Sequence, residues 1–230
     1  MRRFRPGLRM TALVALLIPL TVSLGFWQID RAGQKRAIEE ARLASYGALP
    51  IDENQLADAP PFARIRFRGR YDGAHQFLLD NSMRYGAPGY LVVTPFETAS
   101  GRRVLVNRGW VAAPVSRAEI PDPGAPDGDT RIVAVVWSAS EASRDASDWG
   151  GGWPKRIERF DGRRMSESVS ASIGSEFRLE DDQPGALEPI VLGEEMSATR
   201  HIGYAVQWFS MAIMLLIAFV VLGLRRGREQ

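Results

Sequence analysis

Two uncharged stretches decide how this chain folds: MTALVALLIPLTVSLGFWQI at residues 10–29 and IGYAVQWFSMAIMLLIAFVVLGL at residues 202–224. An α-helix needs about 20 mainly apolar residues to cross the hydrocarbon layer of a bilayer, and each stretch is that long. Proline at position 19 is compatible with a membrane helix, because neighbouring groups satisfy the carbonyl that it frees. We therefore predict transmembrane helices over residues 10–29 and 201–224.

Arginines cluster beside these stretches, at the two ends of the chain. They are Arg2, Arg3, Arg5, Arg9, Arg225, Arg226 and Arg228. Positive residues next to a span are retained on the cytoplasmic side, so the tails 1–9 and 225–230 are predicted to be cytoplasmic. The tails carry +4 and +2 of a net +2, which leaves −4 for the rest. The basic pI therefore reflects the tails, and no nucleic-acid partner is predicted.

A cleaved signal peptide is the alternative reading of the first stretch. Its features are a basic start, an apolar core and small residues near a cleavage point, such as Ser23 and Gly25. The stretch is longer than the roughly 7–15 apolar residues of a signal core, which favours an uncleaved span. The layout is typical of a bacterial inner-membrane protein with a periplasmic domain over residues 30–200.

The residues between the spans predict a β-rich domain that folds without disulfides, because the chain has no cysteine. Strand-like segments occur at 62–69, 76–81, 90–96, 104–111, 130–137 and 176–180. Short turns between strands favour antiparallel pairing. We expect hairpin connections at 71–73 and 99–102, and loops at 85–89, 114–129 and 143–154.

Two helical patterns lie outside the spans. Residues 31–46 continue the first span as a helix, and 161–173 predict a short helix with Asp161 as its N-cap. The predicted fold class is therefore membrane-anchored α+β. Two transmembrane helices flank an antiparallel β-rich external domain, either a sheet or a small barrel, with one or two short helices.

Catalytic motifs are missing from the sequence. It has no G-x-S-x-G, H-E-x-x-H, Walker A or G-x-G-x-x-G pattern and only two histidines, His75 and His201. We predict that the protein is not an enzyme. His75, in a turn between strands, is read as a surface residue.

His201 stands at the external entrance of the second span, where an ionisable side chain is costly and usually functional. Tyr204, Ala205 and Trp208 follow at helical spacing on its face. A flat apolar ligand fits such a face, with the imidazole bound to its metal as a proximal histidine binds haem iron. The alternative is an aromatic belt that fixes the depth of the helix.

The first span brings further polar and aromatic residues to the level of His201. They are Gly25, Phe26, Trp27, Gln28 and Arg31. A site between the two helices is compatible with this placement. Arg31 and Arg200 are then either partners for acidic groups such as propionates or plain interfacial anchors, and we favour anchors.

Charged residues also lie beside apolar strand residues in the external domain, among them Arg70, Asp72, Asp80 and Arg108. Charges in strands need partners. We favour Arg–Asp pairs that fix strand register over a partner-binding surface.

Four segments, in this order along the chain, resemble the Surfeit-locus family of cytochrome c oxidase assembly factors. They are LGFWQIDR at 24–31, PGY at 88–90 with VTPF at 93–96, LVNRGWV at 105–111, and HIGYAVQWF at 201–209. The resemblance covers most of the chain, and the membrane placement of the first and last segments adds to its specificity.

The resemblance implies a membrane chaperone that assists maturation of the haem–copper oxidase at haem a insertion into its catalytic subunit. It also implies that His201 is a haem-iron ligand, because bacterial relatives are described as binding haem a through the histidine of this motif. The implied partners are the oxidase catalytic subunit, the haem a synthesis machinery and the lipid bilayer. The alternative is a haem-independent scaffold that stabilises an oxidase assembly intermediate.

Overall fold

The structure is a computed structural model that describes residues 4, 6–116, 119–137, 144–190 and 198–227, without the side chain of Asn81. It consists of two compact units, one formed by 1–40 with 194–230 and the other by 41–193. The first unit contains most of the two long helices. The second contains the strands and the short helices.

The two long helices are α1, Leu8–Tyr46, and α3, Ala198–Arg226. Both are long and apolar enough to cross a membrane. At about 1.5 Å per residue, α1 is roughly twice as long as the ~30 Å hydrocarbon layer. It continues to Tyr46 as predicted and ends immediately before Gly47.

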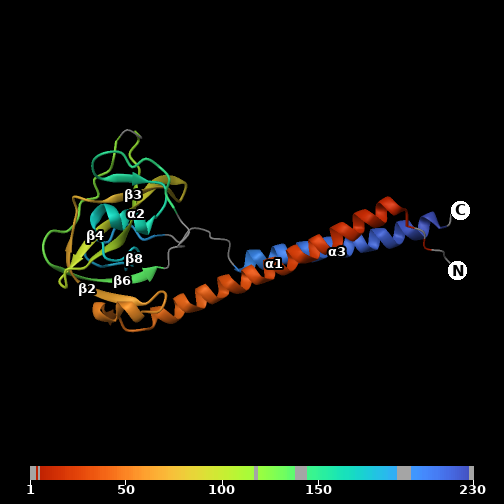
Figure 1. The fold of residues 1–230 in the computed structure, drawn as a ribbon, viewed down its shortest axis with the longest axis horizontal. Helices are drawn as coiled ribbons and strands as arrows, with labels where there is room; N and C mark the ends of the chain where they lie inside the picture. Colours follow the sequence, from red (N-terminus) through yellow and green to blue (C-terminus); the bar gives the residue numbers. More distant parts are fainter. Residues whose placement is uncertain (1–3, 5, 117–118, 138–143, 191–197, 228–230) are drawn as a thin grey trace. The chain divides into compact units, whose positions relative to one another are not determined.

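Small residues line the seam where α1 and α3 run side by side in opposite directions (Figure 1). Near one end the ring of Phe4 lies 5.3 Å from that of Phe219, and further along Phe26 lies 5.3 Å from Phe209. The buried small residues of the two helices are Gly25, Ala32, Ala205, Ala212 and Gly223. Small residues let helix backbones approach closely, which is how membrane helices associate.

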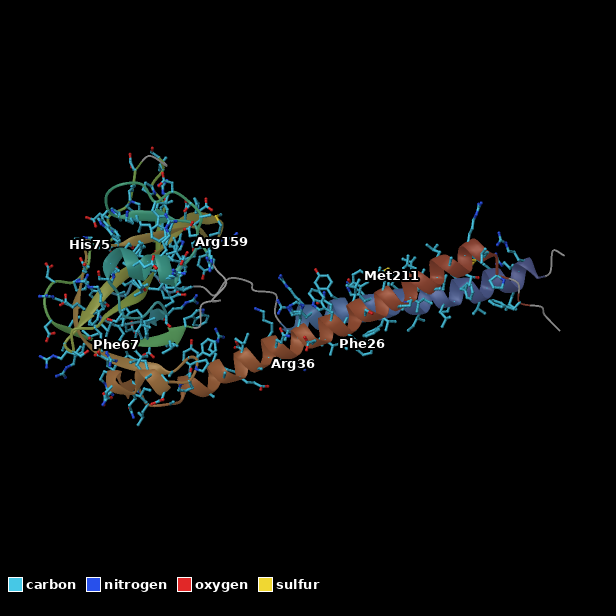
Figure 2. All side chains as sticks on the ribbon, viewed as in Figure 1. Phe26, Arg36, Phe67, His75, Arg159 and Met211 are labelled. Atoms are coloured by element: carbon cyan, nitrogen blue, oxygen red, sulfur yellow. The ribbon has the colours of Figure 1, made fainter. Side chains whose placement is uncertain are left out.

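Large apolar side chains cover the outward faces of both helices, as the sticks at Phe26 and Met211 illustrate (Figure 2). Phe26 is 62% exposed, and Leu16 and Ile213 are also more than half exposed. A helix pair with an apolar exterior and a narrow buried seam is consistent with a lipid environment.

One mixed sheet organises the second unit, in the order β1-β2-β6-β8-β5-β4-β3-β7. Its strands are β1 Ile51–Asp52, β2 Arg64–Tyr71, β3 Phe77–Arg84, β4 Ala87–Thr98, β5 Arg103–Ala112, β6 Thr130–Trp137, β7 Lys155–Ile157 and β8 Glu176–Leu179. The short helices are the 3-10 helix η1, Glu53–Asp58, and α2, Gly162–Val169. The predicted fold class is confirmed. The domain is a sheet rather than a closed barrel, curled until β2 also pairs with β4 over three residue pairs.

The sheet has a core on each face. On one side Phe67, Phe96 and Phe177 are fully buried. On the other, Phe77 and Leu105 pack under α2 through Met165. Alternating burial along β2 shows the two-residue period of a strand with one covered face.

The favoured antiparallel pairing is found in β2–β4, β2–β6, β3–β4, β4–β5 and β6–β8, but three further pairs differ. The pairs β1–β2, β3–β7 and β5–β8 are parallel. In β3–β7 and β5–β8 the later strand reaches its neighbour through a long connection, which is what parallel pairing requires. Turn residues next to the strands give no sign of such distant partners.

Two connections also differ from the predictions. Residues 71–73 do not close a hairpin, because β2 pairs with β6 and β4 rather than with β3. Residues 85–89 are not a loop: Arg84 pairs with Ala87 around Tyr85 and Gly86, whose φ angles are 48° and 82°. Two positive φ angles are the mark of a two-residue type I′ turn. The hairpin predicted at 99–102 is confirmed by the β4–β5 ladder.

The cap predicted for the second short helix is present. The Asp161 side chain accepts a hydrogen bond from the Arg164 backbone nitrogen at 3.0 Å. The helix ends earlier than predicted, at Val169, because Ser170 adopts a left-handed conformation with φ 52°.

Candidate functional site

His201, the predicted site residue, lies in the first turn of α3 and faces α1. Its Nδ1 atom is 2.6 Å from Oε1 of Gln28. His201 is 4% exposed and Gln28 is 7% exposed. Two polar side chains from opposite ends of the sequence therefore meet in the buried seam of the helix pair.

The helical spacing of α1 explains why Gln28 points into the seam. Gly25, Gln28 and Ala32 lie three and four residues apart, so they share one face of the helix, and all three are buried. A Cβ atom on Gly25 would lie 2.7 Å from the Phe209 ring, so glycine leaves the space that this ring occupies. On α3, Ala205 is one turn from His201 and 3% exposed, which keeps the seam narrow.

The aromatic neighbours predicted for His201 do not share its environment. Ala205 is buried with it, but Tyr204 is 43% exposed and Trp208 is partly exposed. On α1, Phe26 and Trp27 are also more than half exposed. The residues expected to share one face therefore have two different environments: His201 is buried with Gln28, and the aromatic rings are exposed.

Arg31 does not join the buried pair. Its Nη1 atom donates to Oε1 of Gln34 at 2.7 Å, and Nε2 of Gln34 donates to Asp30 at 2.7 Å. These exposed contacts stay within one helix. They agree with the reading of Arg31 as an anchor rather than a ligand contact.

The pairing of Gln28 with His201 was not predicted, although the sequence placed both residues at one membrane level. A signal was available, because Gln28 is a polar side chain in an otherwise apolar stretch. Buried polar groups are almost always hydrogen-bonded. A buried glutamine therefore calls for a partner on the neighbouring helix.

The sheet domain has its own buried polar centre at Arg108, which is 4% exposed. Its Nε atom donates to the Gly185 carbonyl at 2.7 Å, and Nη1 donates to the Gly124 carbonyl at 2.5 Å and to Oε1 of Gln76 at 3.2 Å. Burial lowers the pKa of the Arg108 guanidinium, and the neighbouring Tyr71 opposes this shift. Burial likewise raises the pKa of the Tyr71 hydroxyl, which donates to the Pro184 carbonyl at 2.8 Å.

The predicted register-fixing charge pairs are present, but often with other partners. Arg70 approaches Glu97 at 3.4 Å and Arg68 contacts Asp129 at 2.8 Å. Arg108 is a correction: among the described residues its hydrogen bonds go to carbonyl, amide and hydroxyl oxygens, not to an aspartate. A buried guanidinium that reaches several loop carbonyls has no need of a carboxylate in the strand beside it.

His75 is half-exposed and belongs to a local cluster. Its Nδ1 atom lies 2.8 Å from Asp72, and its ring packs edge-on against Trp153 at 4.9 Å. This arrangement agrees with the surface role predicted for His75.

A cavity of about 360 Å³ opens in the sheet domain beside Arg64, Trp137 and Arg178. Two of its arginines are paired: Arg64 makes two hydrogen bonds to Glu180, at 2.5 and 2.8 Å, and Arg178 contacts Glu176 at 2.9 Å while lying over the Trp137 ring. The bond to Glu180 raises the pKa of Arg64, against the effect of burial. Arg64 and Arg178 therefore already have carboxylate partners, and Arg42 and Asp181 complete the charged lining.

Comparison with known proteins gives one consistent result. The model of the SURF1 family matches residues 15–213, a range that includes both Gln28 and His201. A SURF1-like protein of Rickettsia felis is 25% identical over 219 residues, which cover 92% of this chain and 96% of the relative. A SURF1-like protein of Drosophila melanogaster is 30% identical over 228 residues, covering 86% and 72%. Surfeit locus protein 1 of Homo sapiens is 29% identical over 147 residues, covering 54% and 48%. With a family match across both helices and the sheet domain between them, the chain belongs to the SURF1 family.

Proposed function

We propose that this protein is a non-enzymatic assembly factor for haem–copper cytochrome c oxidase. It binds haem a at the external membrane surface and assists its insertion into the catalytic subunit. Two findings support the proposal: membership of the SURF1 family and the burial of His201 in the helix seam. The observation that carries it is His201, a buried imidazole at the end of an apolar helix.

The residues around His201 fit the chemistry of a haem ligand. A neutral imidazole is a common axial ligand of haem iron, and the only other histidine of the chain, His75, lies in the sheet domain and is bound to Asp72. With Nδ1 engaged by Gln28, Nε2 is the nitrogen left for iron. The exposed rings of Phe26, Trp27 and Tyr204 offer apolar surface nearby.

Access to His201 requires a local opening, because the side chain is covered. His201 is the fourth residue of α3, within the turn whose backbone N–H groups have no partner inside the helix. Helix ends open more easily than helix centres. Uncovering the imidazole therefore demands movement of one turn rather than separation of the two helices.

The proposed location follows from the arginines of the tails. With residues 1–9 and 225–230 in the cytoplasm of a bacterium, His201 and the domain over 30–200 are on the periplasmic side of the inner membrane. There the protein receives haem a from the synthesis machinery, and the sheet domain contacts the oxidase catalytic subunit.

The test is absorption spectroscopy of protein purified from cells that make haem a. Wild type and His75→Ala are expected to carry a Soret band with about one haem per chain, whereas His201→Ala loses it. His75→Ala is the matched control, because it removes the only other imidazole. A His201→Ala protein that retains stoichiometric haem would refute the assignment of the ligand.

A haem-independent scaffold is the second candidate, because the hydrogen bond between Gln28 and His201 can also join the two helices without a ligand. In this role the protein would stabilise an oxidase assembly intermediate by contact alone. The scaffold hypothesis predicts co-purification with the catalytic subunit, no Soret band in any variant, and normal oxidase assembly with His201→Ala.

A further inference from the structure

We propose that Gln28 is a positioning residue that holds His201 in the tautomer with hydrogen on Nδ1 and thereby presents Nε2 as the coordinating nitrogen. The identity of the ligand rests on the proposed function. The tautomer does not, because it is a property of the two side chains themselves.

The hydrogen-bonding groups determine the tautomer. Oε1 of Gln28 can only accept a hydrogen bond, since an amide oxygen carries lone pairs and no hydrogen. A contact of 2.6 Å with Nδ1 of His201 therefore requires a hydrogen on Nδ1. A neutral imidazole carries one ring N–H, so Nε2 then has a free lone pair.

The surroundings make this preference strong. Both side chains are more than nine-tenths buried in an apolar seam, where hydrogen bonds are electrostatically stronger than in water. With the Gln28 amide as it lies in the structure, its oxygen toward Nδ1, the opposite tautomer would set two lone pairs against each other and leave a buried amide oxygen without its donor. Such an unsatisfied group is costly, so the opposite tautomer would require the amide to turn and present its NH2 group to Nδ1.

The seam also fixes the direction of the Gln28 side chain. Gly25, one turn before it, lies against the Phe209 ring, and Ala32, one turn after it, is 1% exposed. Close packing on both sides leaves the amide directed at α3. Gln28 is therefore held by the packing of its own helix and not only by the histidine.

An oxygen that accepts the hydrogen bond from Nδ1–H makes Nε2 a stronger electron-pair donor to a metal. Histidines that bind metals nearly always donate their other N–H to an oxygen, which orients the ring and raises its basicity. Gln28 supplies such an oxygen from the opposite helix. It is expected to strengthen the binding of iron by His201 and to lower the reduction potential of that iron.

The first arm of the test needs no haem. Full-length protein with ¹⁵N-labelled histidine and His75→Ala gives one imidazole signal, and its ¹H–¹⁵N couplings report the tautomer. We expect the Nδ1–H form in the parent, a shift toward the Nε2–H form in Gln28→Leu, and a return to the Nδ1–H form in Gln28→Glu, which restores an oxygen acceptor. Gln207→Leu, the same change at an exposed position of α3, is the control and leaves the signal unchanged. An Nε2–H imidazole in the parent, or no response to Gln28→Leu, overturns the proposal.

The second arm measures the reduction potential and the haem affinity of protein loaded in cells that make haem a. Gln28→Leu is expected to raise the potential and to weaken binding several-fold, and Gln28→Glu is expected to reverse both changes. If His201→Ala binds haem like the wild type, the proposed function loses its ligand while the tautomer result stands. If the tautomer responds to Gln28→Leu but potential and affinity do not, the role of Gln28 toward the ligand is refuted.

Discussion

Arg108 in the sheet domain and His201 in the helix pair are buried to the same degree, each 4% exposed, but they are satisfied differently. Arg108 donates to four acceptors from four separate segments of the domain, at Gln76, Thr94, Gly124 and Gly185. His201 has one hydrogen bond, to Gln28, among the described residues. A guanidinium bound to four acceptors of its own domain is a structural tie, whereas an imidazole with one nitrogen still available is suited to a ligand.

The two units therefore have different roles, one structural and one in ligand binding. In the sheet domain, the segment Asn107-Arg108-Gly109-Trp110 of the family pattern serves the fold: Asn107 bonds to Glu176 at 2.7 Å, and Nε1 of Trp110 donates to the Ser82 carbonyl at 3.0 Å. In the helix pair, Gln28 and His201 bind each other, and neither side chain has a further hydrogen bond within the described part of the chain. Substitutions should therefore affect stability in the first unit and ligand binding in the second.

The largest effect is expected from Arg108→Met. It removes the donors of two loop carbonyls, at Gly124 and Gly185, and one of the two donors of the Gln76 amide oxygen, which keeps the Thr94 hydroxyl. A buried polar group without a partner costs about 1–3 kcal/mol, so we expect a loss of roughly 3–5 kcal/mol in unfolding free energy. Thermal unfolding of the full chain in detergent measures it. Arg102→Met, in the exposed β4–β5 turn, is the control, and equal losses in both variants would show that Arg108 is not a tie.

Asp145→Asn should have a smaller effect of the same kind. Asp145 is 6% exposed and accepts from the Ser147 hydroxyl and from backbone nitrogens of Ser147 and Glu158. Burial raises the pKa of Asp145, but these donors outweigh it and lower the pKa to about 2. Hydrogen bonds to a charged group are worth about 1.5–3 kcal/mol, so we expect a loss of about 2 kcal/mol at pH 7.

The pH dependence gives a second check on Asp145. A lowered pKa means that the charged form stabilises the fold above the unfolded value of about 4 and that this stabilisation disappears as the pH falls through 2. The difference between wild type and Asp145→Asn in urea unfolding should shrink over this range. A constant difference from pH 5 to pH 2 would contradict the assignment.

Gly25→Leu tests the helix seam. Any side chain at this position meets the Phe209 ring, since even a Cβ atom would lie 2.7 Å from it. Overpacking costs about 1–3 kcal/mol, and we expect α1 and α3 to shift and part Gln28 from His201. Haem binding should fall while the unfolding of the sheet domain is unchanged. Gly33→Leu is the matched control, because a Cβ atom on Gly33 meets nothing within 4 Å. Equal haem binding in the two variants would show that the seam does not hold the site.

Sequence patterns predicted what depends on local order. Apolar length gave the two long helices, turn chemistry gave the β4–β5 hairpin, and membrane position singled out His201. The parallel pairing of Leu105 with Glu176 could not be predicted, because it joins residues 71 apart in sequence. Arg108 was misread for the same reason, since its acceptors lie on loops that fold back from elsewhere. The partner of His201 depends on the rotation of α1 against α3, which the packing of Gly25 on Phe209 sets and the one-dimensional pattern does not.

The smallest expected effect on stability is that of His201→Ala, although it should abolish haem binding. The substitution removes one hydrogen bond and leaves the Gln28 amide without its donor, a cost of about 1 kcal/mol confined to the helix pair. Unfolding of the sheet domain, followed by the fluorescence of Trp149, which is buried in its core, should change by less than about 0.5 kcal/mol. Arg108→Met should instead destabilise the sheet domain and leave haem binding by the helix pair in place. If His201→Ala destabilised the sheet domain as much as Arg108→Met does, its loss of haem would be a consequence of unfolding. The free nitrogen of His201 would then no longer be a reason to treat His201 as a ligand site and Arg108 as a structural residue.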